Sequence, residues 1–209
     1  MASKTARLGR PPASSSAETR GRIIDIARRA FADHGYEATT NRTIASEADI
    51  TTAAIYHYFD SKLAIYEAVL DEVQERVYHL LATAERGADT FVAKLDAVFE
   101  AAHRLNRADS SLAQFLGASR IDRRRIPELT EALGGSDHRR EEFFDAIVDR
   151  GIETGEISGA DRAAMVSLIS AFTIGLTDGL SGDDAEHRQA VDGFMLAIRG
   201  YVDSADSSS

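Results

Sequence analysis

Apolar residues recur three and four positions apart along almost the whole chain, which is the spacing of one face of an α-helix. The first such segment spans residues 18–33, and His34-Gly35 after it supply a left-handed stop. No segment alternates between apolar and polar residues for long enough to predict a β-strand. The pattern therefore predicts an all-α fold. The buried stripe of the first helix is expected to consist of Ile23, Ala27, Ala30 and Phe31.

Caps and turn residues divide the rest of the chain into further helices. Thr40 caps one short helix, Thr51 or Thr52 caps a second, and Asp60-Ser61 cap a long third one. Glycine, proline and serine separate the later segments. The expected ranges are 41–48, about 52–59, 62–84, 89–106, 110–124, 127–134, 137–154, 160–180 and 184–202. The inner face of the long helix is expected to be Ile65, Val69, Val73, Val77 and either Leu80 or Leu81.

The last two helices carry long apolar stripes. Such a terminal helix pair offers more apolar surface than one small bundle needs, which favours a dimer interface. The alternative is that both helices only complete the core of the monomer. The stripes are Met165, Leu168, Ile169, Phe172 and Leu176 on the first helix, and Val191, Phe194, Met195, Ile198, Tyr201 and Val202 on the second.

Two short helices joined by a tight turn, around residues 40–59, predict a helix-turn-helix unit, which places its second helix in a DNA major groove. Ala45 is small where the helices approach each other, and Asp49 tolerates the left-handed conformation of the turn. Ile50 and Ile55 are apolar residues that can pin the second helix. Glycine would suit the turn better than Asp49, because it has no Cβ to clash.

The segment RIIDIARRAFADHGYEATTNRTIASEADITTAAIYHYFDSKLAIYEAVL, residues 22–70, resembles the DNA-binding head of the TetR family of bacterial transcriptional regulators. It carries the motifs F-x-x-x-G-Y, T-x-x-x-I-A and Y-x-Y-F-x-S-K in order and at the spacing of that family. Asp49 stands where the family usually has glycine. The resemblance implies a DNA-binding domain at residues 18–62 and a ligand-binding and dimerisation domain at 63–202. Residues 1–17 and 203–209 are expected to be a flexible basic arm and a disordered tail.

Four large side chains follow one another in Tyr56-His57-Tyr58-Phe59. Neighbouring helical residues point about 100° apart, so one helix cannot bury all four. We expect Phe59 and Ile55 to anchor the helix and the other rings to face DNA, although a packed hinge between two domains is the alternative. The resemblance implies phosphate contacts at Lys62 and a guanine contact at Arg42. The full set of expected DNA-binding residues is Thr40, Asn41, Arg42, Thr51, Thr52, Ala53, Ala54, Tyr56, His57, Tyr58 and Lys62.

The charge distribution agrees with one DNA-binding end. Residues 1–62 hold nine Lys and Arg against seven Asp and Glu, a net of +2, whereas the remainder holds 15 against 27, a net of −12. Arg10, within the segment GRPP (Gly9 to Pro12), and Arg7 just before it could enter a minor groove, but a solvated tail fits the arm equally well.

Composition and hydropathy favour a cytoplasmic protein. The chain has no cysteine, so disulfides and thiolate metal sites are absent, and no signal peptide is recognisable. The apolar run from Ala163 is about 14 residues long, shorter than the ~20 that a membrane span needs. We therefore predict a buried helix there and no membrane partner.

The body implied by the resemblance binds a small hydrophobic effector. Apolar and aromatic side chains of the middle helices are the expected pocket wall, with three polar groups to orient the ligand, and most of them are also ordinary core candidates. The expected ligand-binding residues are Phe91, Phe99, His103, Leu112, Gln114, Phe115, Leu116, Phe144, Ile147, Phe172, Thr173 and Leu176, and Leu95 was expected beside them.

The resemblance thus implies a homodimeric, ligand-responsive repressor that binds double-stranded DNA at an inverted repeat. Two other classes of function are the alternatives. A helical di-metal enzyme would use Glu100-x-x-His103, with a partial echo in Asp184-x-x-His187. A helical adaptor would need the head motif to be accidental. No phosphate-cradling loop, zinc-protease helix or nucleophile elbow is present. We predict no catalytic residue, no metal and no cofactor.

Overall fold

The computed structural model describes residues 16–134 and 138–206, and all regular elements within these ranges are helices. The predicted all-α fold is confirmed. The arm with Arg7 and Arg10 lies outside the described residues. The elements are α1 (Ser16–Ala38), α2 (Asn41–Glu47), α3 (Thr52–Ile55), α4 (Lys62–Glu85), α5 (Phe91–Ala108), α6 (Ser111–Arg125), α7 (Pro127–Leu133), α8 (His138–Glu153), the 3-10 turn η1 (Gly159–Asp161), α9 (Arg162–Gly179) and α10 (Asp184–Asp206).

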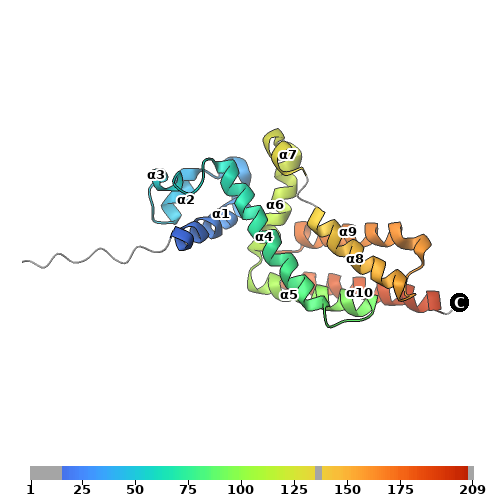
Figure 1. The fold of residues 1–209 in the computed structure, drawn as a ribbon. Coiled ribbons are helices and arrows are strands. Elements are labelled where there is room, and N and C mark those ends of the chain that lie inside the picture. The colour runs from blue at the N-terminus through green and yellow to red at the C-terminus, as the bar shows by residue number, and fades with distance from the viewer. Residues whose placement is uncertain (1–15, 135–137, 207–209) are drawn as a thin grey trace, which may run out of the picture.

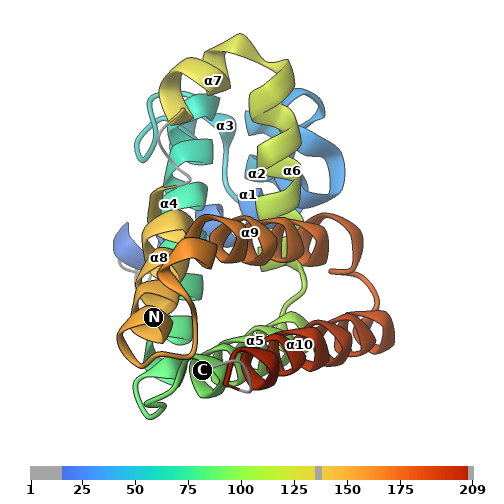
Figure 2. The same cartoon turned by 90° about the vertical axis from the view of Figure 1, so that its right-hand side faces the viewer.

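The helices form two regions, which α4 connects (Figure 1). We call α1, α2, α3 and the first turns of α4 the head, and the rest of α4 with α5 to α10 the body. In the body α10 packs along α5, and α9 packs on α6 and α8 (Figure 2). α6 also packs closely against α1, so it belongs to the contact between head and body.

Side-chain caps begin four of the early helices, and those at Thr40, Thr51 and Ser61 are the ones that the sequence predicts. The hydroxyls of Thr40, Thr51, Ser61 and Thr90 each accept a hydrogen bond from the backbone N–H three residues later. The predicted stop at Gly35 is present as a kink, where φ is 75°, and the chain resumes helical geometry up to Ala38. At the other end α10 continues to Asp206, beyond the expected end at 202.

The hydrophobic core of the head is completed by residues of the body. Phe31 and Tyr66 are fully buried, with ring centroids 4.8 Å apart. Phe115 from α6 lies 5.3 Å from the Tyr66 ring, and Leu129 from α7 joins the same cluster. Aromatic pairs in this geometry add to the free energy of area burial. The head therefore packs as one unit with the start of α4 and with α6 and α7.

Asp122 on α6 ties the body to the head. Its Oδ2 accepts hydrogen bonds from the backbone N–H of Tyr36, at 2.9 Å, and from the Tyr66 hydroxyl, at 3.1 Å. Burial, followed by the charge of Glu128, raises the pKa of Tyr36 to about 12. The Tyr36 hydroxyl thus stays protonated and lies 3.4 Å from Glu128 Oε2 on α7. Three separate groups of the head are therefore bound to α6 and α7.

A second tie joins α1 to the start of α6. Arg28 is only 3% exposed, and its guanidinium donates to Asp109 Oδ2 at 2.9 Å, to Asp25 at 3.2 Å and to the Ser111 hydroxyl. Burial opposes the ionisation of Asp109, but the bonds from Ser111 and Arg28 outweigh it and lower the pKa of that carboxyl. A buried arginine with several acceptors is a stable arrangement, whereas one left without them would be costly.

The apolar stripe of α10 is used inside the monomer. Val191, Phe194, Met195, Ile198 and Val202 are each at most 8% exposed and belong to the core of the body. The stripe predicted as a dimer interface is thus core, because α10 turns it toward α5. What remains for a partner is the opposite face of α10.

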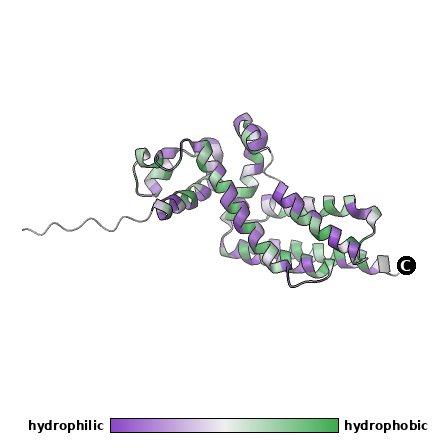
Figure 3. Cartoon of the chain, in the orientation of Figure 1, coloured by the Kyte–Doolittle hydropathy of each residue, from purple (hydrophilic) through white to green (hydrophobic). Residues whose placement is uncertain are grey.

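The prediction that α9 is buried is wrong. The segment Gly159–Gly179, coloured by hydropathy with the rest of the chain in Figure 3, is long and apolar enough to cross a membrane by length and composition. Only 17% of its apolar window is buried. Met165, Ile169 and Leu176 face the core, while Leu168 is 47% exposed. The remaining exposed positions of α9 are mostly small residues, which look apolar in sequence yet do not face the core. One such helix is weak evidence for a membrane span, because helices of soluble proteins pass the same test.

Candidate DNA-binding surface and ligand cavity

α2 and α3 form the predicted helix-turn-helix. Ala45 is 2% exposed at the close approach, and Asp49 takes φ 51°, the one non-glycine residue with positive φ in the described ranges. The backbone N–H of Ile50 donates to Ala45 O at 3.0 Å, which closes the turn. Ile55 is fully buried and pins the second helix. The requirements read from the sequence are met, including the use of aspartate where glycine would be less strained.

The second helix is shorter than expected. Regular helix ends at Ile55, and single turns carry the chain on to Phe59, whose backbone N–H donates to Ile55 O at 3.0 Å. Ile55 and Phe59 point into the core, whereas Tyr56 is 54% exposed and His57 is also exposed. Tyr58 lies between these cases, half-buried against the head core. Exposure of Tyr56 and His57 excludes the packed hinge for these two rings.

The eleven expected DNA-binding residues occupy one part of the head around α2, α3 and the start of α4. Thr51 is the N-cap of α3, and its hydroxyl accepts from Ala54 N at 3.1 Å while its own O–H remains available to a phosphate. Six of the eleven are exposed: Thr40, Arg42, Thr51, Ala53, Tyr56 and His57. Five are half-buried: Asn41, Thr52, Ala54, Tyr58 and Lys62.

Lys62 has an internal role that the sequence did not indicate. Its ammonium donates to the backbone carbonyls of Tyr36, at 2.7 Å, and Thr39, at 3.1 Å, and lies 4.0 Å from the centroid of the Tyr36 ring. Burial lowers the pKa of Lys62, against the opposing charges of Glu128, Glu37 and Asp122. The side chain thus ties α4 to the end of α1, whether or not it also contacts a phosphate.

The body contains an apolar cavity of about 100 Å³ between α4, α5, α6, α8, α9 and α10. By the same measure one water needs roughly 10–15 Å³, so the cavity holds a ligand of several non-hydrogen atoms. Six of the residues expected in a ligand pocket form its wall: Phe99, Leu112, Leu116, Phe144, Thr173 and Leu176.

The other six expected ligand-binding residues lie elsewhere in the structure. Phe91 packs under Gly151, where an added Cβ would come within 2.9 Å of the Phe91 Cβ, and Ile147 lies in the body core. Phe115 belongs to the head core, and Phe172 stacks on Phe194 with ring centroids 4.0 Å apart. Gln114 and His103 also lie outside the cavity wall. Gln114 is half-buried, and His103 forms a hydrogen bond with His187, which does line the cavity. Helical spacing identified apolar faces but not which neighbour each face would meet.

Several polar residues of the cavity wall were missed. They are Asn106, Arg120, Arg140, Thr177 and His187. A signal for two of them is present in the sequence, because Arg120 continues the stripe of Leu112 and Leu116, and Arg140 precedes Phe144 by one helical turn. Long charged side chains can place their stems on an apolar face, so such positions deserve inclusion when a pocket is predicted.

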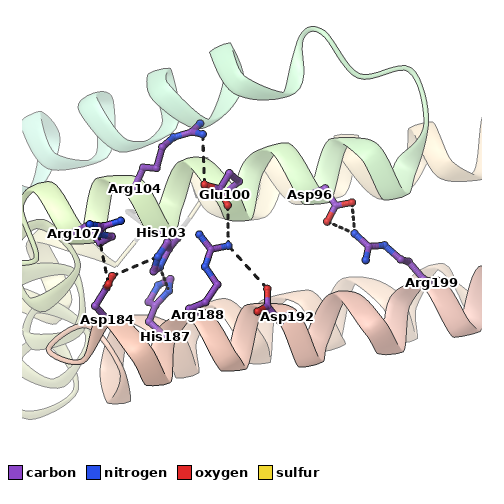
Figure 4. Close-up of polar contacts among 10 residues, drawn as sticks. All are labelled: Asp96, Glu100, His103, Arg104, Arg107, Asp184, His187, Arg188, Asp192 and Arg199. Atoms are coloured by element: carbon purple, nitrogen blue, oxygen red, sulfur yellow. Dashed lines mark hydrogen bonds and ion pairs between the residues drawn. The ribbon is translucent and has the colours of Figure 1, made fainter.

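The two Glu/Asp-x-x-His motifs form part of a polar ladder between α5 and α10 (Figure 4). Glu100 binds Arg188 at 2.8 Å, and the hydrogen bond from Arg188 lowers the pKa of Glu100. His103 Nε2 lies 3.4 Å from Asp184 Oδ1, and His103 Nδ1 lies 3.2 Å from His187 Nδ1. In the part of the chain that the structure describes, no three His, Asp or Glu side chains are placed to hold a metal ion. Arg188 pairs with Glu100, the acidic residue that a metal site would need. The motifs thus join α5 to α10.

Known proteins share the helix-turn-helix segment. The family model described as bacterial regulatory proteins, tetR family, matches residues 23–69. TtgR of Pseudomonas putida, an HTH-type transcriptional regulator, is 41% identical over 68 residues, and the repressor KstR2 of Rhodococcus jostii is 42% identical over 66. Residues 23–69 therefore form a DNA-binding domain of the TetR type. These alignments span only 32% and 30% of the two relatives, about a third of each.

Similarity to TetR-family proteins extends over the body at lower identity. UidR of Escherichia coli, an HTH-type transcriptional regulator, is 23% identical over 88% of this chain and 93% of its own. The structure of Salmonella enterica GusR superposes with a TM-score of 0.73 at 24% identity, covering 91% of this chain and 98% of that one. A regulator from Pseudomonas aeruginosa gives 0.74 at 22%, covering 93% of each chain. The fold shared with these structures thus includes the body. The TetR-family regulators that the chain resembles are not enzymes, which agrees with the prediction.

Proposed function

We propose that this TetR-family protein is a ligand-responsive transcriptional repressor that binds an inverted-repeat operator as a homodimer. The observation that supports DNA binding is the division of the second short helix into two faces. Ile55 and Phe59 fix it to the head, while Tyr56 and His57 stay exposed beside the two exposed residues Thr51 and Ala53. A helix held in this way presents hydroxyls and methyls to phosphates and base edges.

DNA binding is tested by selecting duplexes from a random library and measuring affinity against salt concentration. Binding should weaken as salt rises, because neutralised phosphates release counterions. Tyr56→Ala should weaken binding to all sequences, and Lys62→Ala should also flatten the salt dependence by roughly one phosphate contact. An unchanged salt slope with lowered stability in the Lys62 variant would assign that side chain to the carbonyls of Tyr36 and Thr39 alone.

Base selectivity is tested at Arg42, which is exposed on α2. Arg42→Ala should relax the selected operator sequence, with a loss of roughly 1–3 kcal/mol of discrimination at one position. Arg29→Ala is the matched control, because Arg29 is equally exposed but lies on α1, outside the two short helices. An unaltered operator consensus in the Arg42 variant would reject the assigned role.

The proposed dimer uses the outward faces of α9 and α10. Leu168 on α9 and Leu196 on α10 are 47% and 72% exposed, and both helices carry glycines around which nothing lies within 4 Å. Exposed leucines among small residues allow helices of two chains to approach closely. Two heads on such a dimer would reach successive major grooves about 34 Å apart, which requires an inverted repeat.

The molar mass in solution tests the dimer. Leu196→Glu should halve it and weaken operator binding, because a charge would be buried in the interface. Leu80→Glu is the control, since Leu80 is 37% exposed on α4, away from the two outward faces. A monomeric wild-type protein, or a Leu196 variant that remains dimeric, would contradict the proposed interface.

Release from DNA is proposed to begin in the cavity. Ligand would tilt α4 from its start at Lys62 and change the distance between the two heads. α6 supplies a second connection, because its Leu112 and Leu116 line the cavity while its Asp122 binds Tyr36 and Tyr66. Such a change requires the ligand to bind the released state better than the DNA-bound one.

A further inference from the structure

The cavity wall contains buried arginine nitrogens without an acceptor. Six buried side-chain atoms in the described residues lack a hydrogen-bond partner, and three of them are Arg120 Nε, Arg140 Nε and Arg140 Nη1. Buried polar groups in native proteins are almost always paired, and the pairing matters most for charged groups. Both arginines line the apolar cavity. Their unpaired nitrogens indicate that an acceptor belongs there.

Arg140 is the less compensated of the two cations. Its side chain is 14% exposed, and among the described residues the nearest carboxylate oxygen, Glu141 Oε1, forms an ion pair with Nη2 at 3.9 Å, beyond hydrogen-bond distance. Arg120 differs because its Nη2 donates to the Thr177 hydroxyl and to Asp178. Arg140 therefore has two nitrogens without an acceptor and only one long ion pair, while Arg120 offers one further N–H.

The surroundings define the other half of the ligand. The rest of the wall is mainly aliphatic and aromatic, with Leu81, Leu116 and Phe144 among its residues. Arg120 and Arg140 also line an adjoining surface hollow, together with Arg123 and Arg124, and none of the described residues in its wall is acidic. The two arginines thus lie between an apolar interior and an arginine-rich opening.

We propose that the effector is an amphipathic anion, with an apolar body in the cavity and an oxyanion bound by Arg140 and by the Nε of Arg120. This inference rests on the proposed effector-binding function and specifies the chemical class of its ligand. A carboxylate and a phosphate monoester share the required chemistry. Hydrogen bonds between a guanidinium and an oxyanion in a largely apolar site are strong enough to decide which ligand binds.

The test uses the full-length protein and octyl compounds that differ only in the head group. Octanoate, octyl phosphate, octanol and octylamine are titrated calorimetrically. We expect at least one of the two anions to bind about 10- to 100-fold more tightly than octanol, the range that charge-assisted hydrogen bonds supply, and octylamine to bind weakest. Comparison of octanoate with octyl phosphate identifies the preferred oxyanion, and preference for either one supports the proposal.

Adjacent arginines provide a matched pair of variants. Arg140→Gln should remove the preference for the anion over octanol, whereas Arg139→Gln should keep it, because Arg139 is an exposed residue paired with Glu75 at 3.0 Å. Arg140→Gln should also leave the unfolding temperature of the ligand-free protein unchanged or higher, since it removes a largely buried cation, two of whose nitrogens have no acceptor. An unfolded Arg140 variant would make this residue a structural one and overturn the proposal.

The remaining outcomes separate the ligand class from the proposed function. Equal affinity for octanol and both anions, no binding of any octyl anion, or equal loss in the Arg139 and Arg140 variants would overturn the ligand class. DNA binding, measured in parallel with the selected duplex, would stand in each of these cases. Anion binding that depends on Arg140 in a protein that retains no duplex would instead reject the repressor and keep the anion site.

Discussion

In the head, Arg28 has three acceptors, Lys62 has two carbonyls, and Tyr66 donates to Asp122. In the body, Arg140 has two nitrogens with none. Of the six unpaired buried atoms in the described residues, the Asn41 carbonyl oxygen is the one that lies in the head. The charged groups of the head thus find their partners in the head and in the helices packed against it, whereas the cavity of the body leaves guanidinium nitrogens without an acceptor, as the proposed anion site requires.

The largest effect expected from this contrast concerns two neighbours on α6. Phe115→Ala should lower the free energy of unfolding by about 3–5 kcal/mol, because Phe115 is fully buried in the head core. Leu116→Ala should cost only roughly 1–2 kcal/mol, since Leu116 is half-buried at a cavity that already exists. Urea denaturation measures both. Equal losses of unfolding free energy in the two variants would contradict the distinction between the packed head core and the open cavity of the body.

The polar tie between the regions is the next largest effect. Asp122→Ala should cost about 2–3 kcal/mol, because it leaves the Tyr36 N–H and the Tyr66 hydroxyl without an acceptor. Asp122→Asn should recover part of this loss, as its amide oxygen can still accept. The control is Asp145→Ala, which removes an exposed contact with Arg162 and should cost under ~1 kcal/mol. If the hydrogen bonds of Asp122 contribute nothing, Asp122→Ala and Asp145→Ala will lower the free energy of unfolding by the same amount.

The turn of the head offers a smaller, stabilising change. Asp49→Gly should raise the free energy of unfolding by about 0.5–1 kcal/mol, since residue 49 is exposed and holds φ 51° at a steric cost that glycine avoids. Thermal unfolding measures the gain. Loss of stability would mean that the Asp49 side chain stabilises the turn more than its backbone strains it.

The smallest expected effect is a pH dependence of the body. Burial, and then the charge of His103, lowers the pKa of His187 from its ordinary value of 6.5. The unfolded chain therefore binds the proton more readily, so the stability that His187 contributes is present above pH 6.5 and is lost as the pH falls below it. His187→Gln should flatten that loss in acid denaturation, and His79→Gln, at an exposed site on α4, should not. Identical pH profiles for the two variants would refute this assignment.

Most of the head could be predicted from the sequence, because its structure depends on local rules. Caps at Thr40 and Thr51, a small residue at Ala45 and the left-handed turn at Asp49 all act within a few residues. The exposed rings Tyr56 and His57 followed from helix geometry alone. What sequence did not reveal there is the closure of the head core by Phe115 and the internal bonds of Lys62.

The body shows where such reasoning stops. Apolar spacing placed its helices, yet it could not show that α10 turns its stripe inward, that α9 stays largely uncovered, or that Phe172 stacks on Phe194 instead of facing the cavity. Each of these depends on which helices become neighbours, a choice made between segments far apart in the chain.

The all-helical fold and the position of the helix-turn-helix could be predicted from the sequence, because both follow from hydrogen bonds and side-chain directions within short segments. The motifs of residues 22–70 added the resemblance to a regulator family. Only the tertiary structure decided which side chains enclose the cavity and which charges in it lack a partner. The physical reason is that burial and desolvation are properties of packed neighbours, and no single helix contains the neighbours of Arg140.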